Sequence, residues 1–129
     1  MANITPVYLD VNAGKAVTFA SADAFESTDK LYDSTKTNGA YFKANEKDQK
    51  YVVLLKNGTT SAIDVYVVKG DDEVFGAFND LKVNVPASST VAINVESARY
   101  KQMTSDKGHK EEILFKSASA FSVAVIKLP

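Results

Sequence analysis

The chain has 129 residues, 45% of them hydrophobic and 24% charged, which is the balance of an ordinary globular protein and excludes a disordered or collagen-like chain. The length is too short for two full domains, so we expect a single domain over residues 1–129. The 15 basic and 16 acidic residues leave a net charge of -1, and Arg99 is the only arginine. This argues against a nucleic-acid partner, because phosphate recognition draws on basic patches rich in arginine.

The sequence also lacks the features of a disulfide-bonded, membrane-bound or secreted protein. It contains no cysteine, so we expect neither a disulfide nor a thiolate metal site. No apolar run reaches the roughly 18 residues that mark a membrane-spanning helix. Residues 1–14 have no basic flank of the kind that begins a secretion signal. We therefore expect synthesis in the cytoplasm and no membrane partner.

Hydrophobic and polar residues alternate along most of the chain, which is the pattern of strands with one buried face. Two further segments are nearly continuous apolar runs rich in β-branched and aromatic residues, which indicates central strands covered on both faces. In chain order, the predicted strands with the clearest patterns cover residues 7–11, 51–56, 63–68, 81–85, 91–95, 113–115 and 121–125.

Two short connections have the composition of hairpin turns. Residues 57–61 read Asn-Gly-Thr-Thr-Ser between two apolar runs, and residues 86–90 read Pro-Ala-Ser-Ser-Thr between two alternating strands. Pro86 lacks the N–H that a central strand would donate, so it marks the end of a strand. We therefore expect an antiparallel hairpin at each connection.

The stretch 20–38 is dense in polar residues and predicts a long loop, with one short helix over residues 22–25 capped by Ser21. Elsewhere the turn signals separate eight or nine strands. This is the signature of an all-β, single-domain antiparallel β-sandwich, either immunoglobulin-like or jelly-roll-like. Residues 1–6 precede the first predicted strand as an N-terminal arm.

Residues with catalytic or metal-binding chemistry are sparse and scattered. His109 is the only histidine, and it lies in a polar, turn-like stretch with no nucleophilic serine motif in the chain. The three acidic residues 71–73 are the best candidates for a hard cation, but nothing after them has the ligand spacing of a calcium loop. We therefore expect no enzyme activity, no catalytic residue, no metal and no cofactor.

The apolar segment 74–78, Val-Phe-Gly-Ala-Phe, follows the acidic turn and precedes a predicted strand. Its aromatic rings either fold back over one end of the core or form an exposed contact patch. On the second interpretation, the candidate partner-contact residues are those of this segment and, as a second group, those of the N-terminal arm. They are Val74, Phe75 and Phe78, together with Ala2, Asn3, Ile4, Thr5 and Pro6.

Four segments of the second half carry a family resemblance. Residues 51–57 read YVVLLKN, residues 85–90 read VPASST, residues 95–101 read VESARYK and residues 123–129 read VAVIKLP. With these segments the chain resembles the small virion proteins of tailed bacteriophages that are described as capsid decoration, or cement, proteins. The resemblance implies a short β-sandwich encoded among the head genes, which binds a partner and catalyses nothing.

The resemblance further implies a place on the outer capsid surface of the virion, with the major capsid protein as partner. A homo-oligomer such as a trimer would fit the same role. Three alternatives stay open: a tail, neck or fibre component of the virion, a carbohydrate-binding module for attachment to a host surface, and a hydrolase that uses His109 or the cluster at Asp71.

Overall fold

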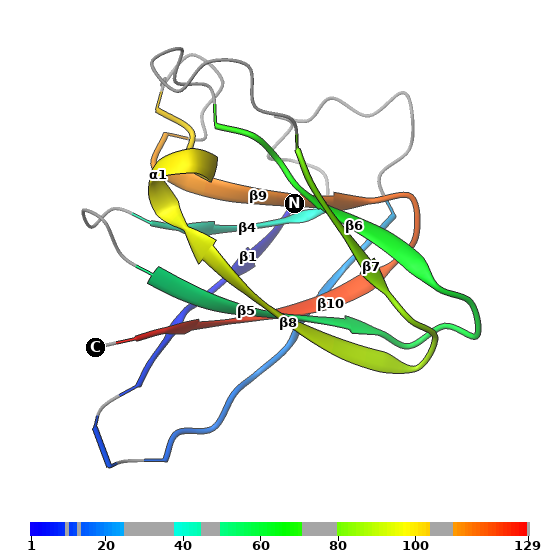
Figure 1. Cartoon of the computed structure of the whole chain (residues 1–129), viewed down its shortest axis with the longest axis horizontal. Coiled ribbons are helices and arrows are strands. Elements are labelled where there is room, and N and C mark those ends of the chain that lie inside the picture. The colour runs from blue at the N-terminus through cyan, green and yellow to red at the C-terminus, as the bar shows by residue number, and fades with distance from the viewer. Residues whose placement is uncertain are drawn as a thin grey trace.

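The structure is a computed structural model in which residues 1–9, 11–12, 14–24, 38–44, 50–70, 80–103 and 110–128 are described. These residues form ten strands and one helix of a single turn (Figure 1). The strands are β1 (Ala2–Ile4), β2 (Val7–Tyr8), β3 (Ala20–Ala22), β4 (Ala40–Lys43), β5 (Lys50–Asn57), β6 (Ile63–Val67), β7 (Leu81–Val85), β8 (Ser89–Glu96), β9 (Glu112–Ser117) and β10 (Phe121–Lys127), and the helix is α1 (Ser97–Tyr100).

The strands form two sheets that enclose one core. Sheet A has the order β1-β4-β9-β6-β7. Sheet B has the order β2-β10-β5-β8, and β3 also pairs with β10. The predicted all-β sandwich is therefore confirmed.

Eight of the strands are paired in a nested order: β3 with β10, β4 with β9, β5 with β8, and β6 with β7. This is the pairing that results when one long hairpin, with its tip between β6 and β7, is rolled up so that its two arms cross between the sheets. It is the topology of a jelly roll. Of the two sandwich types that the sequence left open, the structure selects this one.

The two predicted hairpins are wrong, because each connection joins strands of different sheets. β5 lies in sheet B and β6 in sheet A, so residues 58–62 cross over the end of the sandwich. In the same way, β7 lies in sheet A and β8 in sheet B. The turn residues were recognised correctly, but a turn between two strands does not require that the strands pair with each other.

Three further expectations need correction. Ala20–Ala22 form strand β3 on the edge of β10, so residues 22–24 of the helix predicted over 22–25 are not helical, while residue 25 lies outside the described residues. Among the described residues the helical turn is α1. The predicted strand 7–11 ends at Tyr8. The described residues hold ten strands, more than the eight or nine expected, because β1 and β3 are short segments without a clear alternation.

The sheets are also not purely antiparallel. β1 runs parallel to β4 in sheet A, and β2 runs parallel to β10 in sheet B. The first eight residues therefore pass from one sheet to the other and close one flank of the sandwich, where β1 also lies against β3 and β10 (Figure 1).

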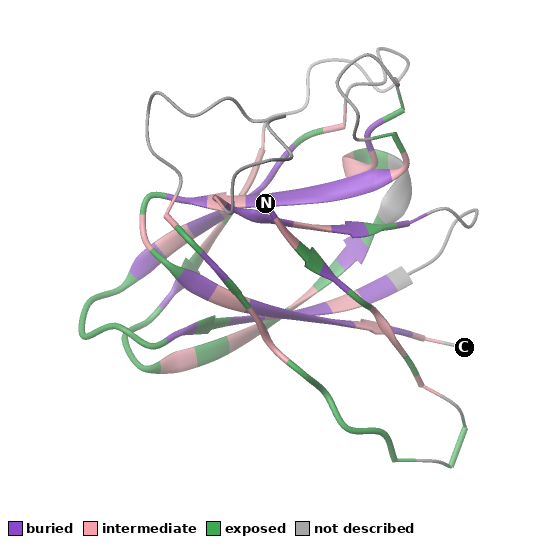
Figure 2. Cartoon of the chain, turned by 180° about the vertical axis from the view of Figure 1, so that it is seen from behind, coloured by how far each residue is buried: buried purple, intermediate pink, exposed green. Residues whose placement is uncertain are grey.

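The core consists of the inward-facing residues of both sheets. On β5 these are Tyr51, Val53 and Leu55, each at most 2% exposed. The ring of Phe42 links strands of the two sheets, with its centroid 4.8 Å from that of Tyr51 and 5.9 Å from that of Phe115. Figure 2 shows the buried positions concentrated on the strands that face each other.

Candidate contact surface

The loop between β2 and β3 extends away from the sandwich, below sheet B in Figure 1. We call residues 9–19 the β2–β3 loop; residues 10 and 13 lie outside the described part. Every described residue from 11 to 18 is exposed, as the continuous green trace of Figure 2 shows. The loop therefore contributes almost nothing to the core of its own chain.

The base of the loop is held on both sides. After β2, the N–H of Leu9 donates to the carbonyl oxygen of Lys127 at 3.0 Å, and the Lys127 ammonium lies 4.5 Å from the centre of the Tyr8 ring. Before β3, the Lys56 ammonium lies 5.5 Å from the centre of the Phe19 ring. Both lysine contacts have cation–π geometry. The loop leaves the sandwich from two fixed points.

The loop carries exposed apolar side chains. Among the described residues, the large hydrophobic side chains that are exposed are Tyr8 (54%), Val11 (75%), Val17 (37%) and Met103 (45%). Val11 and Val17 lie in the loop, and Tyr8 directly precedes it. Isolated exposed hydrophobic residues are ordinary, but Val11 and Val17 share one protruding segment, which makes them candidates for contact with another molecule.

The loop also has a defined turn. Asn12 has a φ of 62°, in the left-handed region that asparagine tolerates better than most residues. It follows Val11 directly, so the chain reverses next to the most exposed apolar side chain of the loop.

The predicted N-terminal contact residues are placed in the sheet rather than in a separate arm. Ala2–Ile4 form β1, in which the Ala2 N–H donates to the carbonyl oxygen of Gly39 at 3.0 Å. Ile4 is 3% exposed and belongs to the core. Asn3 and Thr5 are exposed, whereas Ala2 and Pro6 are half-buried. Of this group, Asn3 and Thr5 offer the most accessible side chains for a partner.

The other predicted contact residues, Val74, Phe75 and Phe78, lie outside the described residues, as do His109 and the acidic residues 71–73. What the structure does describe is the base of that segment. The Lys69 N–H donates to Asp80 Oδ1 at 2.8 Å, and the Lys116 ammonium lies 3.2 Å from Asp80 Oδ2. The chain on either side of residues 71–79 is therefore tied together by one carboxylate.

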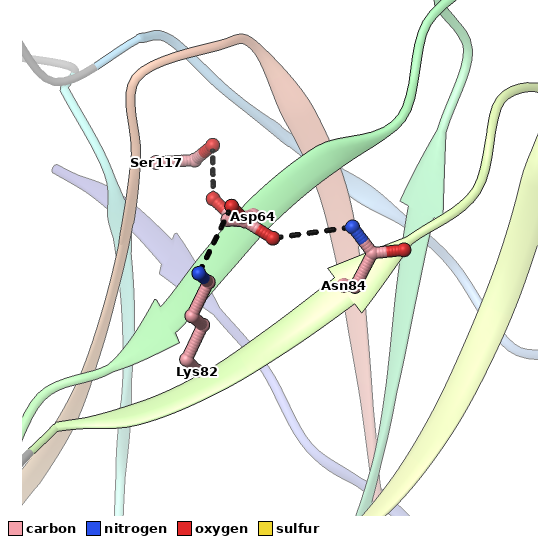
Figure 3. A network of polar contacts seen from close by, with 4 residues as sticks. All are labelled: Asp64, Lys82, Asn84 and Ser117. Atoms are coloured by element: carbon pink, nitrogen blue, oxygen red, sulfur yellow. Dashed lines mark hydrogen bonds and ion pairs between the residues drawn. The ribbon is translucent and has the colours of Figure 1, made fainter.

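The outer face of sheet A carries a polar network (Figure 3). The Asp64 carboxylate accepts a hydrogen bond from Asn84 Nδ2 at 3.2 Å and lies 3.6 Å from the Lys82 ammonium. Ser117 Oγ donates to the Asp64 carbonyl oxygen at 2.8 Å. These contacts join β6, β7 and β9, with Asp64, Lys82 and Asn84 on the outer face and the Ser117 hydroxyl buried.

Two shallow depressions lie elsewhere on the described surface. One, of about 260 Å³, lies at the end of β8 and is lined by Asn94, Glu96, Arg99 and Tyr100. It places Tyr100, which also packs against the core, beside polar and charged groups. The other, of about 240 Å³, includes Lys56 and Phe121 and lies at the crossover end of the sandwich.

No cluster of three or more histidine, cysteine, aspartate or glutamate residues that could hold a metal ion occurs among the described residues. No helix in that part of the chain is long and apolar enough to cross a membrane. Comparisons with protein-family models, with curated proteins and with solved structures found no match.

Tyr8, Val11 and Val17 are not among the contact residues predicted from the sequence, because residues 7–11 are predicted as a strand and residues 12–19 carry no motif. A signal was present. Asn12 and Gly14 follow Val11 at once, and both favour turns. When turn residues directly follow the last apolar residue of a predicted strand, the strand can end before that residue.

Proposed function

We propose that this chain is a non-enzymatic structural protein of a tailed-bacteriophage virion that binds the outer capsid surface and stabilises the shell. The resemblance of residues 51–57, 85–90, 95–101 and 123–129 to decoration proteins gives the family. The observation that carries the proposal is the β2–β3 loop, which presents Val11, 75% exposed, to solvent on a protruding segment with a fixed base.

The loop favours a partner because an exposed loop that is held in one conformation costs conformational entropy. Each residue held in one backbone conformation costs about 1–2 kcal/mol of entropy, and the loop buries too little of its own chain to offset this. Burial of a valine side chain contributes about 1.5–3 kcal/mol, so a partner that covers Val11 recovers part of that cost. The loop is therefore suited to a second surface.

Many identical weak contacts are sufficient for this role. A capsid presents the same seam many times, and a protein that bridges neighbouring subunits gains avidity when it engages two of them together. The jelly-roll sandwich supports this by fixing both ends of the loop to sheet B. The major capsid protein is the proposed partner, and the capsid surface is the proposed location.

The test is binding of the purified chain to particles that lack it. We expect Val11→Asp to weaken particle binding about 10-fold to 100-fold, because an exposed valine that becomes buried is replaced by a carboxylate that must stay hydrated. The measurement is co-sedimentation of the variant with the particles over a range of concentrations.

Met103→Asp is the matched control, since Met103 is also an exposed hydrophobic residue but lies after α1, outside the loop. We expect it to bind like the wild type. Equal binding by wild type and Val11→Asp would contradict the loop as contact site. In that case the double variant Phe75→Ser with Phe78→Ser tests the segment that the sequence analysis favoured.

A further inference from the structure

The free edge of sheet B at β8 is unusual. β8 has eight residues, and within the described part of the chain it pairs with β5 on one side only. Exposed edge strands are normally shortened or carry lysine, proline or a bulge, which discourages pairing with another chain. The edge of sheet A follows this rule, because β7 has five residues and includes Lys82. β8 contains neither lysine nor proline, and its one charged residue, Glu96, is its last.

The flank beside this edge is also incompletely covered. Inward-facing residues of the two edge strands, β7 and β8, pack against the core but are only half-buried. They are Leu81, Val83, Val91 and Ile93. At the opposite flank, β1 closes the sandwich and Ile4 is buried. Considering only the described residues, the β7–β8 flank therefore presents backbone groups without a strand partner next to apolar side chains, which is what an added strand uses.

The chain itself contains an extended segment of suitable size. We call residues 14–18 the donor limb. It is exposed throughout, and Ala16, Val17 and Thr18 form no hydrogen bond with the rest of the described chain. Five residues in extended conformation span roughly 16 Å, and the eight residues of β8 span about 26 Å, so the limb fits within the edge.

We propose that the donor limb of one copy adds as a strand to β8 of a second copy of this chain. The donor limb leads into β3, which pairs with β10 at one edge of sheet B, and β8 is the opposite edge of the same sheet. The addition therefore continues sheet B from one copy into the next.

Side chains support this pairing. Residues alternate across a strand, so Val17 faces one way and Ala16 and Thr18 face the other. With Val17 turned toward the half-buried Val91 and Ile93, the small residues of the limb lie on the outer face, where β8 exposes Thr90 and Ala92. Donor and acceptor are different surfaces, so the contact is head-to-tail and gives a closed ring where the rotation between successive copies closes. This self-association does not depend on what the assembled protein binds.

Engineered cysteines test the contact directly, because the natural chain has none. One preparation carries Val17→Cys, and a second carries Val91→Cys or Ile93→Cys. After mixing and mild oxidation, we expect a disulfide between Val17 and one of the two β8 positions, identified by mass spectrometry of the linked peptides. Because the two cysteines are introduced in separate preparations, such a bond joins two different chains. The matched control is Val11→Cys, on the other side of the same loop, which we expect not to link to β8.

The second measurement is the mass of the wild-type protein in solution by light scattering over a concentration series. We expect the wild type to have a mass that is a discrete multiple of 14.0 kDa. We expect Val17→Asp or Ala16→Pro to lower the association constant at least 10-fold. We expect Val11→Asp to keep the wild-type mass, so a loss of particle binding in that variant is separate from a loss of assembly. A wild-type monomer at every concentration, or equal linking by Val11→Cys, would overturn the proposal and leave β8 as an edge for a strand of another protein.

Discussion

Gly70, which lies after the end of β6, packs closely against the backbone of Arg99 and Lys101. Its N–H donates to the carbonyl oxygen of Arg99 at 3.0 Å. A Cβ atom at this position would lie 2.8 Å from the carbonyl oxygens of both Arg99 and Lys101. These are backbone atoms of the segment that includes the end of α1, so they move only if that whole segment moves.

We therefore expect Gly70→Ala to lower the free energy of unfolding by about 1–3 kcal/mol, the usual cost of an overpacked site. Urea denaturation followed by circular dichroism measures the change. Gly58→Ala is the control, because a Cβ there meets nothing within 4 Å; we expect a change within about 0.5 kcal/mol for this exposed position. Equal stability of the two variants would show that the Arg99–Lys101 backbone yields easily.

At the scale of elements, Asn57 ties together the two connections that cross between the sheets. Its side chain is 1% exposed. Nδ2 donates to the carbonyl oxygens of Ser61 at 2.8 Å and Val85 at 3.1 Å, and Oδ1 accepts from the N–H of Thr59 at 2.9 Å. The Ser88 N–H donates to the Thr59 carbonyl oxygen at 3.1 Å. One amide thus links the β5–β6 crossover to the end of β7.

We expect Asn57→Ala to cost about 1–3 kcal/mol of unfolding free energy, because it leaves the buried Val85 carbonyl without its partner and also removes the part-buried bonds to Ser61 and Thr59. Asn84→Ala is the matched control, since Asn84 bonds Asp64 on the exposed face; we expect a change within about 0.5 kcal/mol. Thermal unfolding of both variants compares them. If Asn57→Ala melts with the wild type, the crossovers are held by the strands alone.

The elements also explain why part of the contact surface escaped prediction. Val7 and Tyr8 do form a strand, as the alternation indicated, but the ladder with β10 has only two residue pairs. β3 occupies the same edge of β10 farther along, from Phe121 to Val123. The segment between β2 and β3 leaves that edge of β10. No local sequence pattern determines how β2 and β3 divide the edge between them.

At the scale of the whole molecule, the proposed role predicts a copy number. In density-purified particles from the source host, we expect the ratio of this chain to the major capsid protein to be near a simple fraction set by the capsid lattice. Quantitative mass spectrometry measures that ratio. Particles that carry the chain should also resist heat better than particles without it.

Other outcomes identify the alternatives. A trace ratio indicates a tail, neck or fibre component, which occurs in few copies and has ring symmetry. Absence of the chain from particles favours a carbohydrate-binding module, for which the depression at Arg99 and Tyr100 is the first place to test.

The sequence by itself determined the all-β class, the approximate position of most long strands and the inward-facing residues such as Val95 and Val123, because alternation depends only on which side of a strand is buried. The tertiary structure alone decided the strand partners. Alternation is the same whichever sheet a strand joins, so the turns at 57–61 and 86–90 were compatible with hairpins and with crossovers alike. Nested pairing between residues as far apart as Ala20 and Val123 selects the crossovers, and among the described residues it leaves the β2–β3 loop and the outer edge of β8 without a strand partner.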